Sequence, residues 1–359
     1  MKILAMYLPQ YHEIKENNEW WGKGYTEWTA VRGAKPLFKG HNQPRKPLDN
    51  RYYDLVNEGV ETWKWQSDLA KEYGVYGFCI YHYWFEGKQL LEKPMEILRD
   101  HPEIDINYCI CWANETWRRN WYGQQKQVLM EQTYGEEVAW KTHFEYLITF
   151  FKDDRYIKIN NKPVVNIYRS SDIKVLPEMI ALWDELAKKE GFDGIYWISA
   201  MTAGNEDKRD ELFDAYYDFE PGYTLKTDLS KIEKQTYLIQ TGLRRIFNKV
   251  SPKKMLEHKI DSQMIYKHIE NRELSPKCFP GTFPQWDNTP RTGTMGVCYM
   301  NSSPEIFEKH LKILNDKYAQ TKTFLYVNAW NEWGEGAYLE PDEQERYNYL
   351  NTIKNIMLK

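Results

Sequence analysis

Two glutamates lie three residues apart in the segment VNAWNEWGEG, residues 327–336 of the chain. Glu332 and Glu335 alternate there with Trp330 and Trp333, directly after KTFLYV, an apolar run that predicts a buried strand. A solvated turn is the plain alternative, but charged pairs set among indoles and glycines are unusual in turns. Cleavage of a glycosidic bond needs one carboxyl group that protonates the leaving oxygen and one carboxylate that acts as base or nucleophile. The pattern therefore predicts a catalytic pair at a strand end.

The two carboxyl groups need different pKa values for this chemistry, and their surroundings can provide the difference. A like charge nearby and apolar indole walls both raise the pKa of a carboxyl group. A spacing of three residues after a strand could place the pair on opposite sides of a sugar ring. The spacing alone fits a retaining enzyme as well as an inverting one.

Strand and helix patterns alternate along all 359 residues. Short apolar runs typical of strands buried on both faces occur at residues 2–8, 75–84, 106–112, 162–169, 194–200, 215–220 and 323–330, with a less regular one between 276 and 298. Helical patterns occur at residues 61–74, 90–100, 136–152, 177–191, 304–319 and 342–357. This alternation predicts a single (β/α)8 TIM barrel over residues 1–359, with an insertion at 223–275. A doubly wound open sheet is the alternative, but no glycine-rich phosphate loop follows any strand.

Polar and aromatic residues follow almost every expected strand. In a barrel of this kind the catalytic side chains gather at the C-terminal ends of the strands. The candidates for substrate binding there are Tyr11, His12, Trp28, His82, Tyr83, Trp84, Trp112, Asn114, Glu115, Trp117, Tyr168, Trp330, Asn331 and Trp333. His82 could instead be a hydrogen-bonded core histidine, Asn114 and Glu115 could cap the next segment, and the indoles could fill the core. Their concentration at one end of the strands favours a common site.

The composition agrees with a carbohydrate ligand. Buried Trp and Tyr need hydrogen-bond partners, so cores favour aliphatic residues and Phe, yet this chain has 15 Trp and 27 Tyr. Sugars offer flat apolar faces and polar edges that match such side chains, although many of them will simply fill the core. Lys and Arg total 48 against 52 Asp and Glu, a net charge of −4 without the basic stripe of nucleic-acid-binding proteins.

The cysteines and the first residues bear on the compartment. The five cysteines include no CxxC pair and no zinc-type spacing, which indicates a reduced compartment and no metal site. The first apolar run breaks at Pro9, too early for the core of a signal peptide, and no apolar run reaches about 18 residues. We therefore expect a cytoplasmic protein that needs no cofactor.

One stretch departs from the barrel pattern. Residues 231–259 carry eight Lys or Arg but only two acidic residues, and LIQTGLRRIFNKV within them is basic and amphipathic. An exposed insertion helix is the plain interpretation. The alternative is a segment that contacts a membrane surface or an anionic lipid-linked glycan.

Several longer motifs together resemble one known family. They are YLPQYH, EWWGKGYTEWTAV, AKPLFKGHNQP, YGFCIYHYWFEGKQLLEKP, CWANETW, KPVVNIYR and AWNEWGEGAYLEPD. In this order they resemble the WbsX-type proteins, a glycoside hydrolase family 99-like group often encoded with surface-polysaccharide biosynthesis genes. The resemblance runs from about residue 3 to residue 345 and implies a (β/α)8 barrel.

The characterised family 99 enzymes are more distant endo-acting α-mannosidases and mannanases with a closing motif similar to NEW-x-E. By this resemblance Glu332 would deprotonate the sugar 2-hydroxyl group, which then attacks its own anomeric carbon and gives a 1,2-anhydro intermediate. Glu335 would be the general acid and later the base, so we expect a raised pKa for Glu335 and an ionised Glu332. Gly334 stands where those enzymes usually carry His, which leaves the sugar open.

The sequence is consistent with three functions. The leading one is a retaining, metal-free glycoside hydrolase or transglycosidase, possibly endo-acting, on a cell-surface polysaccharide or its lipid-linked precursor. The second is a glycosyltransferase of O-antigen or capsular polysaccharide biosynthesis, although no nucleotide-sugar motif is present. The third is a non-catalytic glycan-binding protein, against which the intact pair Glu332 and Glu335 counts.

Overall fold

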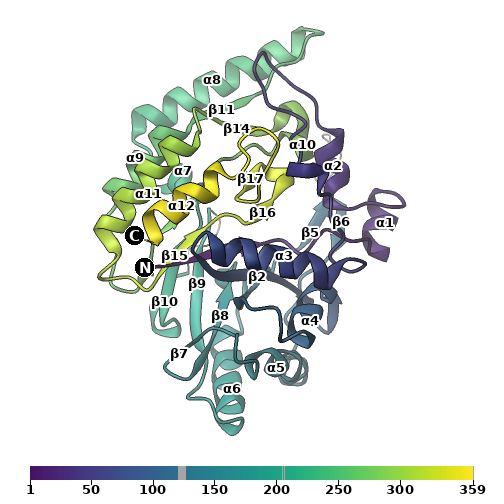
Figure 1. Ribbon diagram of the computed structural model, residues 1–359, viewed down its shortest axis with the longest axis vertical. Coiled ribbons are helices and arrows are strands. Elements are labelled where there is room, and N and C mark those ends of the chain that lie inside the picture. Colours follow the sequence, from purple (N-terminus) through teal and green to yellow (C-terminus); the bar gives the residue numbers. More distant parts are fainter. Residues whose placement is uncertain (120–126, 204, 206, 359) are drawn as a thin grey trace.

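A computed structural model describes residues 1–119, 127–203, 205 and 207–358. Its central sheet has the strand order β12-β10-β9-β8-β4-β2-β1-β15-β13, and every pairing along this path is parallel. These strands are β1 (Lys2–Tyr7), β2 (Val75–Phe85), β4 (Asn107–Trp112), β8 (Lys162–Ile167), β9 (Tyr196–Met201), β10 (Ala215–Asp218), β12 (Cys278–Phe279), β13 (Gly281–Thr282) and β15 (Phe324–Val327). Figure 1 shows the helices arranged around the outside of the strands. The predicted (β/α)8 barrel is confirmed.

The seventh barrel strand, expected between residues 276 and 298, is divided at Pro280. Its first half, β12, pairs with β10, and its second half, β13, pairs with β15. Gly281 is required at this point because a Cβ atom there would lie 1.7 Å from the carbonyl oxygen of Asp218 on β10. The divided strand therefore joins the two ends of the sheet and closes the barrel.

Helices follow the strands close to where the sequence predicts them. They are α3 (Gly59–Glu72), α4 (Lys93–Asp100), α5 (Glu137–Phe151), α6 (Leu176–Lys189), α11 (Pro304–Tyr318) and α12 (Asn348–Met357). A further helix, α9 (Ser262–Asn271), lies within the expected insertion, where the sequence did not predict it. The last helix begins at Asn348 rather than near residue 342, because Asp342 pairs with Pro47 and accepts a backbone hydrogen bond from Glu345 in a turn.

Short elements extend the barrel. The short strands are β3 (Lys88–Leu90), β5 (Trp117–Arg119), β6 (Gln127–Met130), β7 (Lys158–Ile159), β16 (Asn331–Glu332) and β17 (Ala337–Tyr338). The connection between β1 and α3 contains α1 (Lys15–Trp21) and α2 (Glu27–Gly33), and α10 (Thr289–Thr292) follows the seventh strand. Strands β16 and β17 form a hairpin directly after β15, so the segment with the glutamate pair leaves the barrel at its C-terminal end.

The expected insertion contains α7 (Gly222–Thr227), α8 (Lys231–Val250) and β11 (His258–Asp261). Helix α8 begins with a capping box, in which Ser230 and Glu233 each bond the backbone N–H of the other. Strand β11 pairs in parallel with β14 (Val297–Met300), outside the barrel sheet. Within the described residues, every helix is too short or too polar to cross a lipid bilayer.

Candidate active site

The C-terminal ends of the barrel strands surround a cavity of about 520 Å³. Its walls come from residues at or just after the ends of β1, β2, β4, β8, β9, β10 and β15. The aromatic lining residues are Tyr81, Tyr83, Trp117, Tyr168, Phe219, Trp286 and Tyr299, and the charged ones are Glu27, Glu115, Arg291, Glu332 and Glu335. A cavity of this size is usual for a small-molecule site, and flat rings beside a few charged groups suit a sugar.

Three carboxylates meet one guanidinium in the wall of this cavity. Arg291 donates from Nε to Glu27 at 2.8 Å, from Nη2 to Glu332 at 2.9 Å and from Nη1 to Glu335 at 2.7 Å. The side chains of Glu27 and Glu332 are 2% and 8% exposed, whereas Glu335 is 25% exposed. Glu335 is therefore the carboxyl group of the three that is most open to water or to a leaving group.

Gly334 is what allows this charged cluster to form. A Cβ atom on Gly334 would lie 1.7 Å from Oε1 of Glu27 and 2.8 Å from Nε of Arg291. Glu27, at the start of α2, therefore uses the space that any other residue at position 334 would fill. Glu27 can therefore bind Arg291 in this position only because residue 334 is a glycine.

Gly336 and Asp287 fix the other side of the glutamate segment. Gly336 has φ +57°, a left-handed conformation that glycine adopts without strain, and a Cβ atom there would crowd the backbone of Asp287. The N–H of Asp287 donates to the carbonyl oxygen of Glu335 at 2.7 Å. Because Asp287 lies four residues before Arg291, this contact holds α10 and its arginine against the pair.

Burial governs the protonation of the pair. It raises the pKa of Glu332 to about 8; Arg291 opposes this rise, and the nearby Glu335 and Glu27 add to it. Burial also raises the pKa of Glu335, again against Arg291. The pKa of Glu335 is raised as expected, but that of Glu332 is raised as well, because the cavity wall buries both carboxyl groups; the expected contrast between an ionised Glu332 and a protonated Glu335 is therefore absent.

Trp330 and Trp333 lie behind the pair rather than in the cavity wall. Their indole N–H groups donate to Glu340 at 3.1 and 2.7 Å. The same carboxylate accepts from Gln66 at 2.7 Å and from Tyr53 at 3.0 Å. Burial raises the pKa of Glu340 to about 7, and these donors oppose the rise. Glu340 thus anchors the backbone that carries the catalytic candidates.

Alternate residues of β2 face opposite sides of the sheet. Tyr81 and Tyr83 line the cavity, whereas His82 and Trp84 face outward to α5. His82 lies 2.8 Å from Nε2 of His143, and Trp84 stacks on the same imidazole at 4.3 Å between centroids. Of the three β2 residues predicted to bind substrate, the structure places only Tyr83 in the cavity.

The predicted site residues at the ends of β4 and β8 also fall into two groups, one that lines the cavity and one that points away from it. Glu115, Trp117 and Tyr168 line the cavity. Trp112 points away and donates to a backbone carbonyl of β2 at 3.2 Å. Asn114 binds the N–H and the carbonyl oxygen of the residue after Tyr168, both at 2.9 Å, and so joins the two strand ends.

The candidates near the first strand support the glutamate segment from outside the cavity. The Asn331 side chain accepts from the N–H of Leu8 at 2.8 Å and donates to its carbonyl oxygen at 3.0 Å. The Tyr11 hydroxyl donates to the carbonyl oxygen of Asn331. Trp28 packs on Tyr11 at 4.6 Å, and burial lowers the pKa of His12 to about 4. Asn331, Tyr11 and Trp28 position the site rather than line its cavity, and His12 is buried outside the cavity lining.

The sequence reasoning missed Glu27, Arg291 and Tyr81. The alternation of β2 would have identified Tyr81, since it shares a face with Tyr83. Glu27 resembles an ordinary acidic residue in the first turn of a helix, where negative charge is generally favoured. Arg291 lies in a four-residue helix without a periodic pattern. Glu27 and Arg291 are 264 residues apart, so no local signal joins them.

A family model described as "Glycosyltransferase WbsX" matches residues 3–353. The chain belongs to the WbsX family. The uncharacterized protein WxcX of Xanthomonas campestris pv. campestris is 33% identical over 367 residues, which cover 99% of this chain and 50% of that protein. WxcX of a second strain of this bacterium is equally similar. The WbsX chain thus spans about half the length of the curated relatives it matches.

Solved structures show the same barrel. The GH99 endo-alpha-mannosidase of Bacteroides thetaiotaomicron matches with a TM-score of 0.56 and 12% identity, covering 98% of this chain and 95% of that one. A glycoside hydrolase-like protein matches with a TM-score of 0.59 and 10% identity, covering 99% and 93%. At these identities the likeness establishes the fold of the WbsX chain as that of GH99 enzymes.

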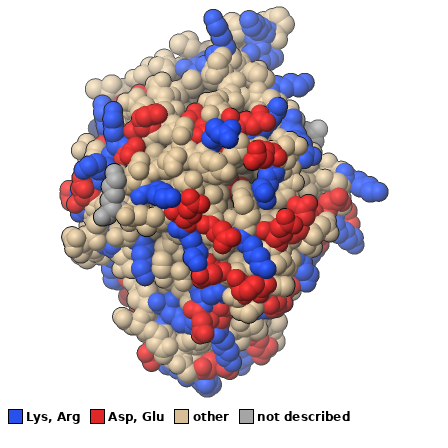
Figure 2. Space-filling view, in the orientation of Figure 1, with Lys and Arg blue, Asp and Glu red and all other residues tan. Residues whose placement is uncertain are grey.

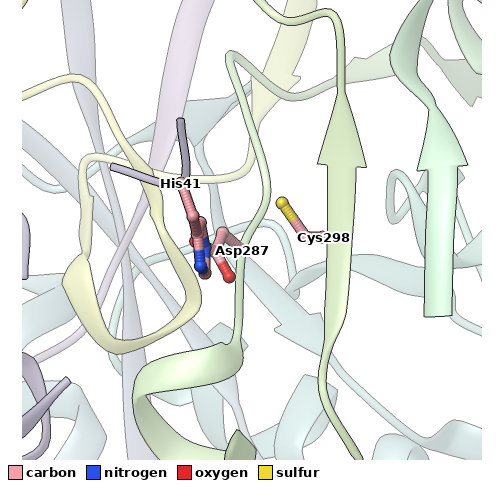
Figure 3. A group of neighbouring side chains, drawn as sticks. All are labelled: His41, Asp287 and Cys298. Carbon is pink, nitrogen blue, oxygen red and sulfur yellow. The ribbon is translucent and has the colours of Figure 1, made fainter. Parts of the chain in front are cut away.

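One buried group of the WbsX chain has the composition of a metal site. His41, Asp287 and Cys298 place their donor atoms within 4.8 Å of one another (Figure 3). The N–H of Leu37 donates to Nδ1 of His41, so Nε2 carries the hydrogen and donates to Asp287 at 2.8 Å. Gln43 also donates to this carboxylate, at 2.7 Å. Since neither imidazole nitrogen keeps a free lone pair, the group acts as a hydrogen-bonded support for α10.

Proposed function

We propose that this WbsX protein cleaves or transfers a glycosidic bond with Glu332 as base and Glu335 as acid. The observation that carries the proposal is the pair itself: two carboxyl groups in the wall of one cavity, both bound to Arg291. The pKa of Glu332, raised to about 8, suits a group that exchanges protons near neutral pH, and the pKa of Glu335 is raised in the same direction. The greater exposure of Glu335 suits the acid, which must reach both the leaving oxygen and the incoming water.

In the first step Glu332 takes the proton of the sugar 2-hydroxyl group. The sugar oxygen O2 then forms a bond to the anomeric carbon while the glycosidic bond breaks. Glu335 gives its proton to the leaving oxygen. In the second step water attacks the anomeric carbon and opens the 1,2-anhydro ring. Glu335 takes the proton of this water, and Glu332 returns its proton to O2. Two displacements at one carbon retain its configuration, and a sugar hydroxyl in place of water gives transglycosylation.

Glu332 must first lose its own proton to act in this way. Its pKa of about 8 means that a substantial fraction is protonated at neutral pH. The contact with Arg291 stabilises the ionised form. We therefore expect kcat/KM to rise with pH through this range, as the base ionises.

The proposed substrate is a cell-surface polysaccharide or its lipid-linked precursor, attacked from within the chain. The open cavity with rings from several strand ends supports an oligosaccharide rather than a single small sugar. The endo-acting relative of known structure supports internal cleavage by analogy of fold.

A glycosyltransferase that uses a nucleotide sugar is the second candidate, because the family model carries that description. The charges of the cavity count against it. Four glutamates line the cavity, and the lining includes a single basic side chain, Arg291, among the described residues. Arg291 already binds three of these glutamates, so the described lining offers a diphosphate no free cationic side chain.

The variants Glu332→Gln and Glu335→Gln test the pair. On a surface polysaccharide each should lose at least ~10²-fold in kcat because each removes one proton-transfer group. A good aryl leaving group should rescue Glu335→Gln, which lacks only the acid, but not Glu332→Gln. The control Glu343→Gln changes an exposed carboxylate outside the cavity and should keep full turnover.

Three further measurements separate the alternatives. A 2-deoxy form of the substrate lacks the attacking oxygen and should not be cleaved, whereas a glutamate nucleophile would tolerate it. Turnover that depends on an added nucleotide sugar would favour the transferase, and binding of a glycan without turnover would favour a non-catalytic protein. Wild-type rates in both glutamine variants would exclude the proposed mechanism.

A further inference from the structure

Helix α8 exposes an apolar stripe along its whole length. Ile232, Ile239, Leu243, Ile246 and Val250 are 76%, 63%, 63%, 61% and 79% exposed. Their spacings of seven, four, three and four residues place them on one face of the helix. Contiguous apolar surface of this kind on a soluble domain usually marks a contact site.

The opposite face of α8 is firmly attached to the protein. Thr241 is buried, and the Tyr237 hydroxyl lies 2.6 Å from Nδ1 of His258 on β11. Asn248 donates to the carbonyl oxygen of Met255 and accepts from its N–H, both at 2.8 Å. The helix is thus held in place with its apolar stripe directed outward.

The charges of α8 match a negative surface. The helix carries five Lys or Arg and one Glu, in a chain whose net charge is −4. Figure 2 shows basic side chains gathered at the upper edge of the molecule, where Figure 1 places the end of α8. Lys231 and Lys249 are exposed, and among the described residues neither has an acidic partner within ion-pair distance. An apolar stripe beside unpaired lysines is the pattern of helices that lie in the interface of an anionic bilayer.

We propose that α8 docks this protein on an anionic lipid surface, with Ile239, Leu243 and Ile246 entering the interface and Lys231 and Lys249 facing the headgroups. This proposal is independent of the chemistry in the cavity. Arg244 and Arg245 serve another purpose, since both bind Glu257 and help to hold the helix on the protein.

The docking helix lies close to the cavity in the fold. It packs on β11, and β11 pairs with β14, in which Val297 and Tyr299 line the cavity. The register places Ile260 of β11 opposite Tyr299. A lipid surface under α8 would therefore lie near the cavity, where a glycan attached to a lipid could reach it.

Vesicle sedimentation with the full chain tests the proposal. The protein should bind vesicles of phosphatidylcholine mixed with phosphatidylglycerol and bind much less to phosphatidylcholine alone. Lys231→Gln with Lys249→Gln should lower the partition coefficient by roughly tenfold or more, since each basic residue near the surface contributes about fivefold. Added salt should weaken binding of the wild type, because it screens exposed charges.

A second set of variants separates the stripe from the charge. Ile239→Ser, Leu243→Ser and Ile246→Ser together should abolish vesicle binding while circular dichroism and glycan binding stay unchanged. The control Lys188→Gln with Lys189→Gln removes two exposed lysines from α6 and should bind as the wild type does.

Three results would overturn the proposal. Equal binding to both kinds of vesicle would show that charge is not recognised, and absence of vesicle binding would show that lipid is not the partner. A dimer in sedimentation velocity that the serine variants convert to a monomer would assign the stripe to a second copy of the chain instead.

Discussion

The contact between Gly334 and Glu27 can be tested by stability alone, without a substrate. In Gly334→Ala the new Cβ atom would lie 1.7 Å from Oε1 of Glu27. Ordinary contact needs about 3.5 Å, so the carboxylate must move by nearly 2 Å. That displacement takes it out of hydrogen-bond range of Arg291, which it now meets at 2.8 Å.

The expected loss in the free energy of unfolding follows from the contacts that each substitution changes. Gly334→Ala combines overpacking, about 1–3 kcal/mol, with the loss of one partner from a buried ion cluster, about 3–5 kcal/mol when the pair is isolated. Because Arg291 keeps Glu332 and Glu335, we expect about 3–4 kcal/mol for Gly334→Ala and about 2–3 kcal/mol for Glu27→Ala. The double variant should cost little more than Glu27→Ala, since the methyl group fills the space that the carboxylate left.

Urea unfolding of the wild type, both single variants and the double variant gives the coupling free energy. We expect the double variant to be more stable than the sum of the single effects predicts by about 3 kcal/mol, nearly the whole cost of Gly334→Ala, which is the upper end of couplings between residues in contact. Gly242→Ala, at a glycine in α8 with open space around it, is a matched control that should show no coupling with Glu27→Ala. Effects of Gly334→Ala and Glu27→Ala that add within about 0.5 kcal/mol would refute the reasoning.

Three further predictions follow from the same cavity. Because the pKa of Glu332 is raised from 4.5 to about 8, the folded protein keeps a proton that the unfolded chain releases, so stability should fall with rising pH between these values. Urea unfolding at several pH values should give a shallower fall for Glu332→Gln, and an unchanged slope would contradict this. Glu340→Gln replaces an acceptor oxygen with an NH2 group that faces other donors. It should lower the free energy of unfolding by about 1–3 kcal/mol and shift the Trp fluorescence, while the exposed control Glu343→Gln should leave both unchanged. Trp117→Ala should raise KM with little change in stability, whereas Trp112→Ala should lower stability by about 3–5 kcal/mol; equal effects on KM would place both indoles at the substrate.

The barrel could be predicted because its strands are buried on both faces. Runs such as KILAMY and VYGFCIYHYWF have few polar interruptions, and β1 and β2 coincide with them almost to the residue. The seventh strand was the exception, since its two halves are two residues each and are separated by Pro280. A proline inside a strand removes the hydrogen-bond donor on which the usual pattern depends.

The candidate site was predicted only in part. The glutamate pair, Tyr83, Glu115, Trp117 and Tyr168 lie in the cavity, as their place after the strands indicated. His82, Trp84 and Trp112 lie behind the wall because adjacent residues of a strand point to opposite faces. Candidates outside the barrel strands, such as Asn114 and Trp330, are held there by their own hydrogen bonds. The partners Glu27 and Arg291 depend on contacts between distant parts of the chain, which a local pattern does not contain.

The separation of these partners along the chain also has a kinetic consequence. Glu27 follows the first strand and Glu332 the last, and the first and last strands pair at Lys2 and Phe324 only when the barrel closes. Bringing residues so far apart together costs loop-closure entropy, so we expect these contacts to form late in folding. Until that step the carboxyl groups around Arg291 can stay hydrated, so partly folded chains avoid the desolvation of buried charge. The strand pairing that closes the barrel then provides the free energy to bury these carboxyl groups. We therefore expect the pKa values of Glu332 and Glu335 to rise in the same step in which the barrel closes.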